Sequence, residues 1–172
     1  SIRQAHAFLG LHLAENGQKD SARNVLNKYD KNVLQENLPY GFTSNRGNFH
    51  NRVSMTFLLA ALRAEDWTLA DKVSKSLKRD LEQQMSYYRS LGDAMPNEKL
   101  AMEAAAIMNG RGGNLSDKQY DFANDILSSF QMLNQIGEWE KQFKPGGKGG
   151  SAELAPDSLS TPEKPVIDTT KP

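Results

Sequence analysis

The segment YGFTSNRGNFHNR, residues 40–52, gathers the side chains of this chain that are best suited to holding a ligand. Arg46 and Arg52 carry fork-shaped groups of N–H donors that match phosphate or carboxylate. Asn48 and Asn51 carry amides of the kind that hydrogen-bond sugar hydroxyls, and Tyr40 could offer a flat aromatic face. The same side chains could instead bond backbone groups and helix ends, and so only stabilise a long connection. Both interpretations stay open at the level of the sequence.

Polar and aromatic side chains some 30 residues further on could meet this segment when the chain folds. Gln84, Tyr87 and Tyr88 fall within one predicted helix. The candidate residues for binding a ligand or a partner are therefore Tyr40, Arg46, Asn48, His50, Asn51, Arg52, Gln84, Tyr87 and Tyr88. A rival hypothesis is a small hydrolase, or a domain that binds sugar or an anion, built on Arg46, His50, Arg52 and Tyr88.

Other patterns that often signal catalysis fail on spacing or context. His6 and His12 lie six residues apart, whereas zinc ligands on one helix face are spaced i, i+4. The GGKGGS run at 146–151 lacks the Ser or Thr that follows lysine in a phosphate-binding loop. The carboxylate pairs Asp121/Asp125 and Glu138/Glu140 are expected on solvated helix faces. The sequence therefore predicts no catalytic residue, no metal ligand and no cofactor.

Composition excludes several classes of partner. The 172 residues contain 21 Lys+Arg and 21 Asp+Glu, so the formal net charge is zero. A chain with no cationic excess is a poor ligand for nucleic acid. There is no cysteine, and no apolar run approaches the 18 or more residues of a membrane span. We expect neither nucleic-acid binding nor direct insertion of this segment into a membrane.

The hydrophobic periodicity predicts an all-α fold of about six helices. We expect the first helix to end at Asn16-Gly17 and to bury a stripe formed by Ala5, Phe8, Leu9, His12 and Leu13. The next helices are predicted over 19–33, from Phe49 to Ala64, and from the Asp66-Trp67 corner to Leu91-Gly92. A fifth is predicted over 97–108. Ser116 and Gln119 form a capping box that opens a sixth, running through Trp139.

A weak internal repeat suggests how the first four helices are arranged. AENGQKDSARNVLNKY and RAEDWTLADKVSKSLK align at an offset of 48 residues, which matches Ala22 with Ala70. A helix, a tight polar turn and a second helix that opens with a small residue resemble a tetratricopeptide-like hairpin, whose usual period is about 34 residues. We therefore expect antiparallel hairpins in a right-handed array. The surplus length falls at 34–48, which makes the segment described first an insertion between two hairpins.

Composition changes sharply near residue 144. We assign residues 1–143 to the helical-repeat domain and residues 144–172, rich in Gly, Pro, Ser and Thr, to a flexible, disordered C-terminal tail. At the other end, Ser1-Ile2-Arg3 enters a helix without an obvious cap. The expectation is that the chain was cut from a longer protein.

Several strings between Asn37 and Leu91 resemble a known family. RGNFHNR, ADKVSKSLKRDLEQQM and YYRSL are similar to the soluble C-terminal part of bacterial multi-spanning membrane proteins that are glycosyltransferase-like and related to protein O-mannosyltransferases. The likeness is looser over 92–143 and absent from the tail. The resemblance implies a membrane-anchored parent whose membrane part would carry the chemistry, with this domain on the extracytoplasmic, periplasmic side of the inner membrane. No catalytic residue of the family falls within this chain.

The functional expectation combines these points. It is a non-catalytic helical-repeat module that docks a protein or glycan-acceptor segment beside the parent membrane domain. The alternatives are the sugar- or anion-binding domain or hydrolase described above, and a purely structural lid or oligomerisation piece.

Overall fold

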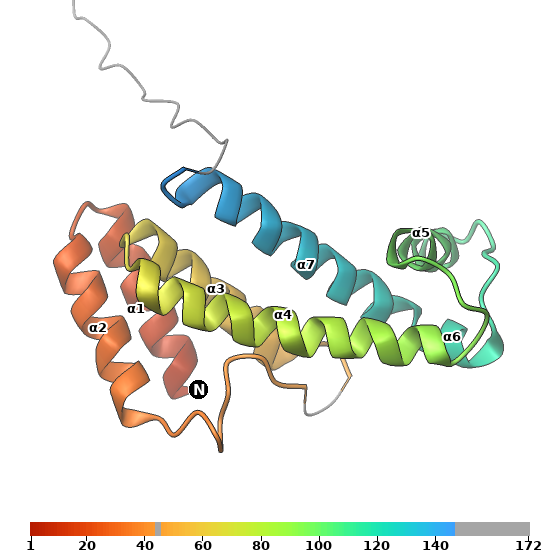
Figure 1. Ribbon diagram of the computed structural model, residues 1–172, viewed down its shortest axis with the longest axis horizontal. Coiled ribbons are helices and arrows are strands. Elements are labelled where there is room, and N and C mark those ends of the chain that lie inside the picture. The colour runs from red at the N-terminus through yellow and green to blue at the C-terminus, as the bar shows by residue number, and fades with distance from the viewer. Residues whose placement is uncertain (44–45, 147–172) are drawn as a thin grey trace, which may run out of the picture.

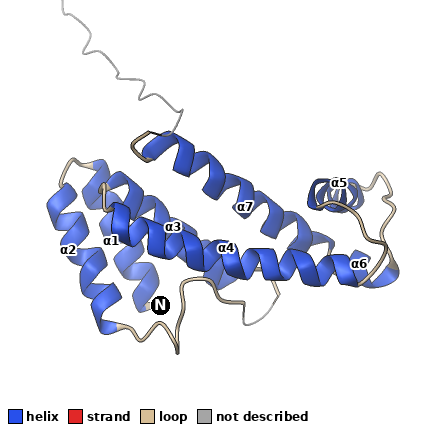
Figure 2. Cartoon of the chain, in the orientation of Figure 1, coloured by secondary structure: helices blue, strands red, loops and turns tan. Residues whose placement is uncertain are grey.

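The computed structural model describes residues 1–43 and 46–146, and within these ranges the chain is entirely helical, without strands (Figures 1 and 2). The all-α prediction is therefore confirmed. Seven helices are described, and they are α1 (Ile2–Glu15), α2 (Lys19–Asn32), α3 (Phe49–Arg63), α4 (Trp67–Ser90), α5 (Asn97–Met108), α6 (Asp117–Asp121) and α7 (Ala123–Phe143). Of the predicted tail, residues 147–172 lie outside the described part of the chain. Among the described helices, none combines the length and the apolar character that crossing a bilayer would require.

The turns α1–α2 and α3–α4 have the same backbone geometry, as the repeat suggested. Gly17 and Glu65, 48 residues apart, both adopt a positive φ, of 76° and 58°. In the first turn the N–H of Gln18 donates to the carbonyl of Leu13 at 2.9 Å, and in the second Asp66 donates to Ala61 at 2.9 Å. This is the bonding of a Schellman helix end, in which a left-handed residue lets the chain reverse. Ala22 and Ala70, the equivalent small residues, are both fully buried.

The sixth predicted helix is interrupted. The capping box of Ser116 and Gln119 is present, but the helix that it opens, α6, ends after five residues. Phe122 leaves helical geometry with φ −105° and ψ 11°, and α7 begins directly after it. The prediction of about six helices thus misses one of the seven that are described. The hydrophobic period continues across the break at Phe122, so the sequence pattern does not show that the helix is interrupted there. The kink places the Phe122 side chain beside the end of α4.

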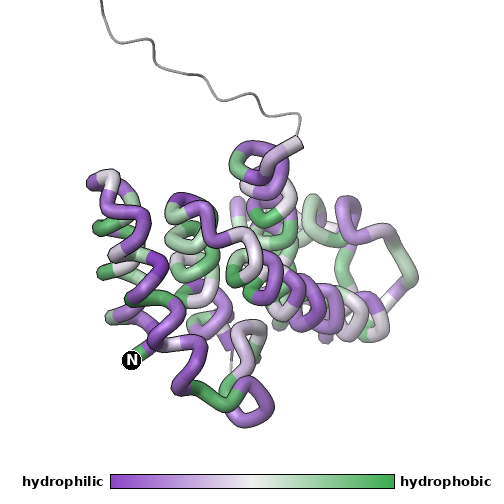
Figure 3. The backbone as a smooth tube through the Cα atoms, turned by 60° about the vertical axis from the view of Figure 1, so that its left-hand side comes forward, coloured by the Kyte–Doolittle hydropathy of each residue, from purple (hydrophilic) through white to green (hydrophobic). Residues whose placement is uncertain are grey.

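The core consists of two adjoining clusters of buried side chains. The larger joins α1 to α4 with the C-terminal half of α7, and the smaller joins the end of α4 to α5 and the start of α7. The long helices α4 and α7 connect the two clusters, while α5 crosses at the far end (Figure 1). Hydrophilic and hydrophobic residues alternate along each helix, as expected where helices pack by one face (Figure 3). The six residues of α4 that were predicted to face the core are all buried: Leu69, Val73, Leu77, Leu81, Met85 and Tyr88.

The predicted buried face of α1 is wrong. Phe8 and Leu9 are 56% and 49% exposed, and the buried stripe is instead Arg3, Ala7, Gly10 and Ala14. A Cβ added to Gly10 would lie 2.6 Å from the Leu26 side chain, so α1 and α2 touch where α1 has no side chain. Where two helices cross closely, small residues are buried and large ones stay outside. The buried face of α1 is therefore the opposite of the one that hydrophobicity alone predicts. The first helix also has a cap after all, since Ser1 and Gln4 form a capping box.

Candidate functional site

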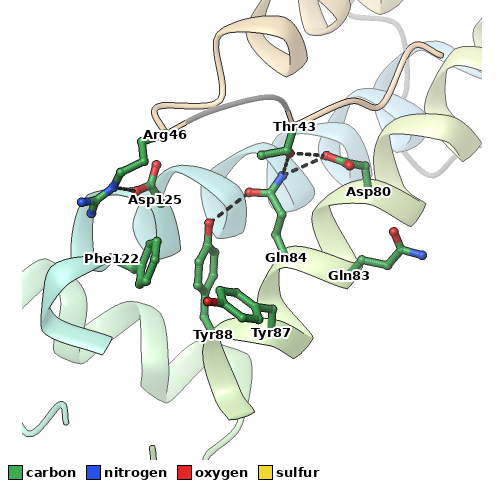
Figure 4. Close-up of a pocket in the computed structure, with 9 residues that line it drawn as sticks. All are labelled: Thr43, Arg46, Asp80, Gln83, Gln84, Tyr87, Tyr88, Phe122 and Asp125. Carbon is green, nitrogen blue, oxygen red and sulfur yellow. Dashed lines mark hydrogen bonds and ion pairs between the residues drawn. The ribbon is translucent and has the colours of Figure 1, made fainter. Parts of the chain in front are cut away.

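Thr43 and Arg46, in the inserted connection between α2 and α3, lie at a hollow on α4 and α7 (Figure 4). The hollow has a volume of about 480 Å³, within the usual range for small-molecule sites. We call it the aromatic hollow. Its lining residues are Thr43 and Arg46 of the insert, Asp80, Gln83, Gln84, Tyr87 and Tyr88 of α4, Phe122, and Asp125 of α7.

Three aromatic rings form one part of the hollow. Tyr88 is buried against Phe122, with ring centroids 5.3 Å apart, whereas Tyr87 is 52% exposed. Tyr87 meets Phe122 edge-on, at 5.9 Å and 80° between the ring planes. Because Tyr87 and Tyr88 follow each other on α4 and Phe122 sits at the α6–α7 kink, the break in the last helix is what completes this aromatic wall.

The base of the hollow is a continuous network of amide, hydroxyl and carboxylate groups. The Gln84 side chain lies at its centre, and its Nε2 has acceptors on Thr43 at 2.6 Å and on Asn48 and Asp80 at 2.9 Å. Its Oε1 accepts hydrogen bonds from Ser129 at 3.0 Å and from the Tyr88 hydroxyl at 3.2 Å. A network in which each member has partners is rigid. It ties the insert to α4 and α7 at once.

Asn48 and Asn51 belong to this network and are almost completely buried. The Asn51 amide donates to Asn48 at 3.0 Å and to Asp80 at 2.7 Å, and its carbonyl accepts from the backbone N–H of Phe42. Asn48 donates to Ser129 at 2.9 Å. These two asparagines therefore stabilise the insert, as the structural interpretation of the segment predicted, and do not face a ligand.

Arg46 and Asp125 form a polar wall of the hollow, beside the aromatic one. Arg46 Nε lies 3.3 Å from Asp125 Oδ2, and the backbone N–H of Gly47 donates to the other carboxylate oxygen at 2.7 Å. The guanidinium carbon lies 4.8 Å from the centroid of the Phe122 ring, a cation–π distance. The guanidinium of Arg46 thus contacts Asp125 through Nε and the ring of Phe122 through its face, while 63% of the side chain stays exposed. Asp125 is buried, so the prediction that it lies on a solvated face is wrong.

Burial also changes the acidity of the tyrosine at the base. Loss of water around the Tyr88 hydroxyl raises its pKa to about 12, with a smaller contribution from the negative charge of Asp125. Tyr88 is protonated at neutral pH, as any tyrosine is, and burial keeps it so into more alkaline solution; its hydroxyl donates to Gln84. Its protonation fixes one direction of hydrogen bonding in the base of the hollow.

Arg3 and Tyr40 hold the other end of the insert. The Arg3 side chain is buried and donates to the carbonyls of Leu38 and Pro39, both at 2.8 Å, and to Ser54 at 3.0 Å. Tyr40 is fully buried, and its hydroxyl donates to Asp30 at 2.9 Å. Burial first, and then this hydrogen bond, raise the pKa of Tyr40 far above its ordinary value. Tyr40 is therefore a core residue and is not available to a ligand.

The structure brings together four of the nine predicted site residues at the aromatic hollow: Arg46, Gln84, Tyr87 and Tyr88. His50 lies elsewhere: its ring centroid is 5.3 Å from that of Phe42, and its side chain lines a separate cavity beside α1. Arg52 lines a groove between α1 and α3 and reaches Ser128 at 3.5 Å. The constellation of Arg46, His50, Arg52 and Tyr88 required by the hydrolase hypothesis is thus not assembled.

Five lining residues were missing from the predicted set: Thr43, Asp80, Gln83, Phe122 and Asp125. One signal could have found Asp125. Asp125, Ser129, Met132 and Ile136 are all buried at helical spacing, so the buried face of α7 begins polar and ends apolar. Polar side chains that continue an apolar stripe indicate a buried polar partner. Phe122 and Thr43 had no comparable signal, because their positions depend on the kink and on the path of the insert.

The carboxylates of the hollow offer little for a reaction. Oδ2 of Asp80 has three donors, from Thr43, Asn51 and Gln84, and Asp125 is held by Arg46 and Gly47. Both oxygens of Asp125 are thus bonded by protein donors, which leaves it poorly placed to take a proton from a substrate, whereas Oδ1 of Asp80 has no partner among the described residues. Within residues 1–43 and 46–146, no three His, Asp or Glu side chains come together in a way that could hold a metal ion.

Comparison of the chain with protein-family models, with curated proteins and with solved structures found no match. The geometry of the aromatic hollow therefore carries the functional argument.

Proposed function

We propose that this chain is a non-catalytic binding module, and that the aromatic hollow is where it holds a ligand or a segment of a partner. The observation that carries the proposal is the division of labour around the hollow. At its base the side chains of Gln84, Asn48, Asn51 and Ser129 are buried and bonded to one another, whereas Tyr87 and Arg46 stand beside them with much of their surface exposed. Exposed aromatic and guanidinium groups on a rigid support are the residues that dominate binding energy at interfaces.

The structural interpretation of the insert accounts for a different set of residues. Tyr40, Asn48 and Asn51 are buried and serve the fold. Among the described residues Arg46 has one ion-pair partner, the buried Asp125, which it meets through Nε, and 63% of the Arg46 side chain stays exposed. The two interpretations of the segment thus apply to different residues: the buried ones hold the insert, and those at the rim of the hollow bind.

The wider context of the proposal comes from the sequence. The equivalent turns at Gly17 and Glu65 support a tetratricopeptide-like origin for the two hairpins, and such hairpins commonly serve as docking surfaces. The resemblance of residues 37–91 to the soluble part of membrane glycosyltransferase-like proteins supports a place beside such a membrane domain, on its periplasmic side. The partner would then be a protein or a glycan-acceptor segment that the parent protein acts on.

A fragment titration tests the binding site while the natural partner is still unidentified. The full 172-residue chain, labelled with ¹⁵N, is titrated with phenol, indole, benzamide and N-acetylated amino-acid amides, and amide chemical shifts are recorded. We expect the shifts that saturate to cluster on 83–88 of α4 and on 122–125. Saturating shifts confined to other cavities, such as the one beside His50, would contradict the proposal, as would no saturating shift at all.

A further inference from the structure

The free polar groups around the aromatic hollow are of mixed type. Within the described residues, the Nη atoms of Arg46, the amide of Gln83 and Oδ1 of Asp80 have no hydrogen-bond partner, whereas Gln84 is engaged through both of its side-chain atoms. Arg46 can only donate, the Asp80 carboxylate can only accept, and the Gln83 amide can do both. A ligand that uses them needs several groups that each donate and accept, which is the property of neighbouring hydroxyls.

The positions of these groups suit a ring-shaped ligand. Arg46, Asp125 and Phe122 lie on one side of the hollow, Asp80 and Gln83 lie on the other, and Gln84, Tyr87 and Tyr88 stand between them (Figure 4). The exposed ring of Tyr87 therefore has polar groups on both sides. A ligand with an apolar face and polar edges could cover that ring and reach the groups beside it.

The charges around the hollow disfavour an anionic ligand. One guanidinium, that of Arg46, stands against the two carboxylates of Asp80 and Asp125, so the formal charge of the lining is negative. Arg46 is moreover already paired, at 3.3 Å, with the buried Asp125. A phosphate or carboxylate would gain one partner and meet two like charges.

A cationic ligand is disfavoured for a different reason. The place that a cation would take, over Phe122 and next to Asp125, is occupied by the guanidinium of Arg46, whose Cζ lies 4.8 Å from the ring centroid. A second cation there would have to displace Arg46 or lie against it. The lining thus disfavours an anion, and the part at Phe122 and Asp125 disfavours a cation, so neutral polar ligands match the hollow best.

We infer that the aromatic hollow binds a neutral carbohydrate, with the C–H face of a pyranose ring on Tyr87 and its hydroxyls bonded to Arg46, Gln83 and Asp80. The inference rests on the proposed function, because it names the ligand class of the same site. No bond is made or broken, and the sugar leaves unchanged. The exposed side chain of Tyr87 is the main apolar contact, so its removal affects binding more than the loss of any one hydroxyl partner.

The test is an NMR titration of the full chain with methyl glucoside, maltose, cellobiose and lactose as neutral probes, sodium glucuronate as the anionic probe and choline as the cationic probe. We expect at least one neutral probe to bind with a Kd of about 1–10 mM, a usual affinity for a small and shallow contact. The shifted amides should include those of Gln83, Tyr87 and Phe122. Glucuronate and choline should bind no more tightly than the neutral probes.

Two tyrosines provide the variant and its control. Tyr87→Ala should weaken binding of the neutral probe about tenfold, which is the loss expected for an aromatic stacking contact. Tyr120→Ala removes a similarly exposed ring, 59% against 52%, from α6 and should change Kd by less than about twofold. If Tyr87→Ala does not fold, Gln83→Ala, at an exposed position of α4, should weaken binding about threefold to tenfold through the lost hydrogen bond.

Each outcome decides the question. If no neutral probe binds although the fragments of the earlier titration saturate the hollow, the carbohydrate inference is overturned and the binding module stands. Tighter binding of glucuronate or choline, or equal losses in Tyr87→Ala and Tyr120→Ala, would also overturn it. If neither fragments nor sugars bind at the hollow, the proposed function falls as well.

Discussion

Arg3 shows at the scale of one residue how the insert is given its path. Its guanidinium is buried without a carboxylate within 4 Å among the described residues, and its charge is met by carbonyl and hydroxyl oxygens and by the faces of Tyr29 and Tyr40. Burying a charge costs several kcal/mol unless hydrogen bonds satisfy it. The buried charge of Arg3 is therefore tolerated only when residues 38–40 lie where their carbonyl oxygens can accept hydrogen bonds from its guanidinium. A residue of the first helix turn fixes the start of the insert.

Gly41 makes the next contact, and it allows a sharp prediction. A Cβ at this position would lie 2.0 Å from the backbone oxygen of Ser76, so α4 and the insert touch through the missing side chain. Gly41→Ala should lower the free energy of unfolding by about 2–4 kcal/mol, because backbone cannot yield as a flexible side chain can. Urea unfolding followed by circular dichroism measures the change.

Gly137→Ala is the matched control for Gly41→Ala. An added Cβ at Gly137, within α7, meets nothing within 4 Å. Alanine is favoured over glycine inside a helix, so Gly137→Ala should raise the free energy of unfolding by about 0.5–1 kcal/mol. Similar losses in both variants would contradict the close approach of the insert to α4.

At the scale of elements, the two equivalent turns differ in one strained residue. Gly17 takes the left-handed conformation at little cost, but Glu65 takes it with a side chain. Glu65→Gly should stabilise the protein by about 0.5–1 kcal/mol relative to Glu65→Ala. Both variants lose the ion pair with Lys19, so the comparison isolates the backbone. Thermal and urea unfolding of the two variants measure the difference, and equal stabilities would show that residue 65 carries no strain.

The packing of α7 on α4 gives a prediction of pH dependence. Burial alone would raise the pKa of Glu140, but hydrogen bonds from Lys78 and Ser74 outweigh it, and the net effect lowers the pKa from its ordinary 4.5. A carboxyl with a lower pKa in the folded protein stabilises the fold above its unfolded pKa and loses this contribution as pH falls through the folded value. Glu140→Gln should therefore be less stable than the parent chain at pH 7, and the gap should narrow below about pH 4.5.

Glu138→Gln separates this effect from a general effect of charge. Glu138 is exposed, and its one ion-pair partner among the described residues is Lys141, on its own helix. Urea unfolding at a series of pH values should give a flat, small difference for Glu138→Gln and a pH-dependent one for Glu140→Gln. A gap for Glu140→Gln that stays constant down to pH 3 would contradict the assigned contacts between α4 and α7.

At the scale of the whole molecule, the sequence predicted elements better than faces and contacts. The amphipathic period and the caps located six helical regions, because both signals are local. The buried face of α1 was predicted wrongly because hydrophobicity favours Phe8 and Leu9, whereas the close crossing at Gly10 is decided by the partner helix. The break at Phe122 was missed because no local residue demands it.

Only some of the residues that line the aromatic hollow were predicted from the sequence, for a similar reason. Arg46, Tyr87 and Tyr88 were chosen by chemistry, and the structure places them around one hollow. Asn48 and Asn51 have the same chemistry but are buried by their contacts with α4 and α7. Whether an amide in the insert binds a ligand or holds the loop depends on contacts with residues 30 to 80 positions away, which no local pattern encodes.

The central claim is that the rim of the hollow binds and its base holds the fold. Arg46→Ala tests it most directly when unfolding by urea and titration with the saturating fragment are measured on the same sample. Arg46 is 63% exposed, but its partner Asp125 is buried and keeps the Gly47 N–H as a donor in the variant, so we predict that the free energy of unfolding falls by about 1–3 kcal/mol while fragment binding weakens by about tenfold. Unchanged fragment binding, with any fall in the free energy of unfolding, would show that Arg46 only holds the loop, and would contradict the account.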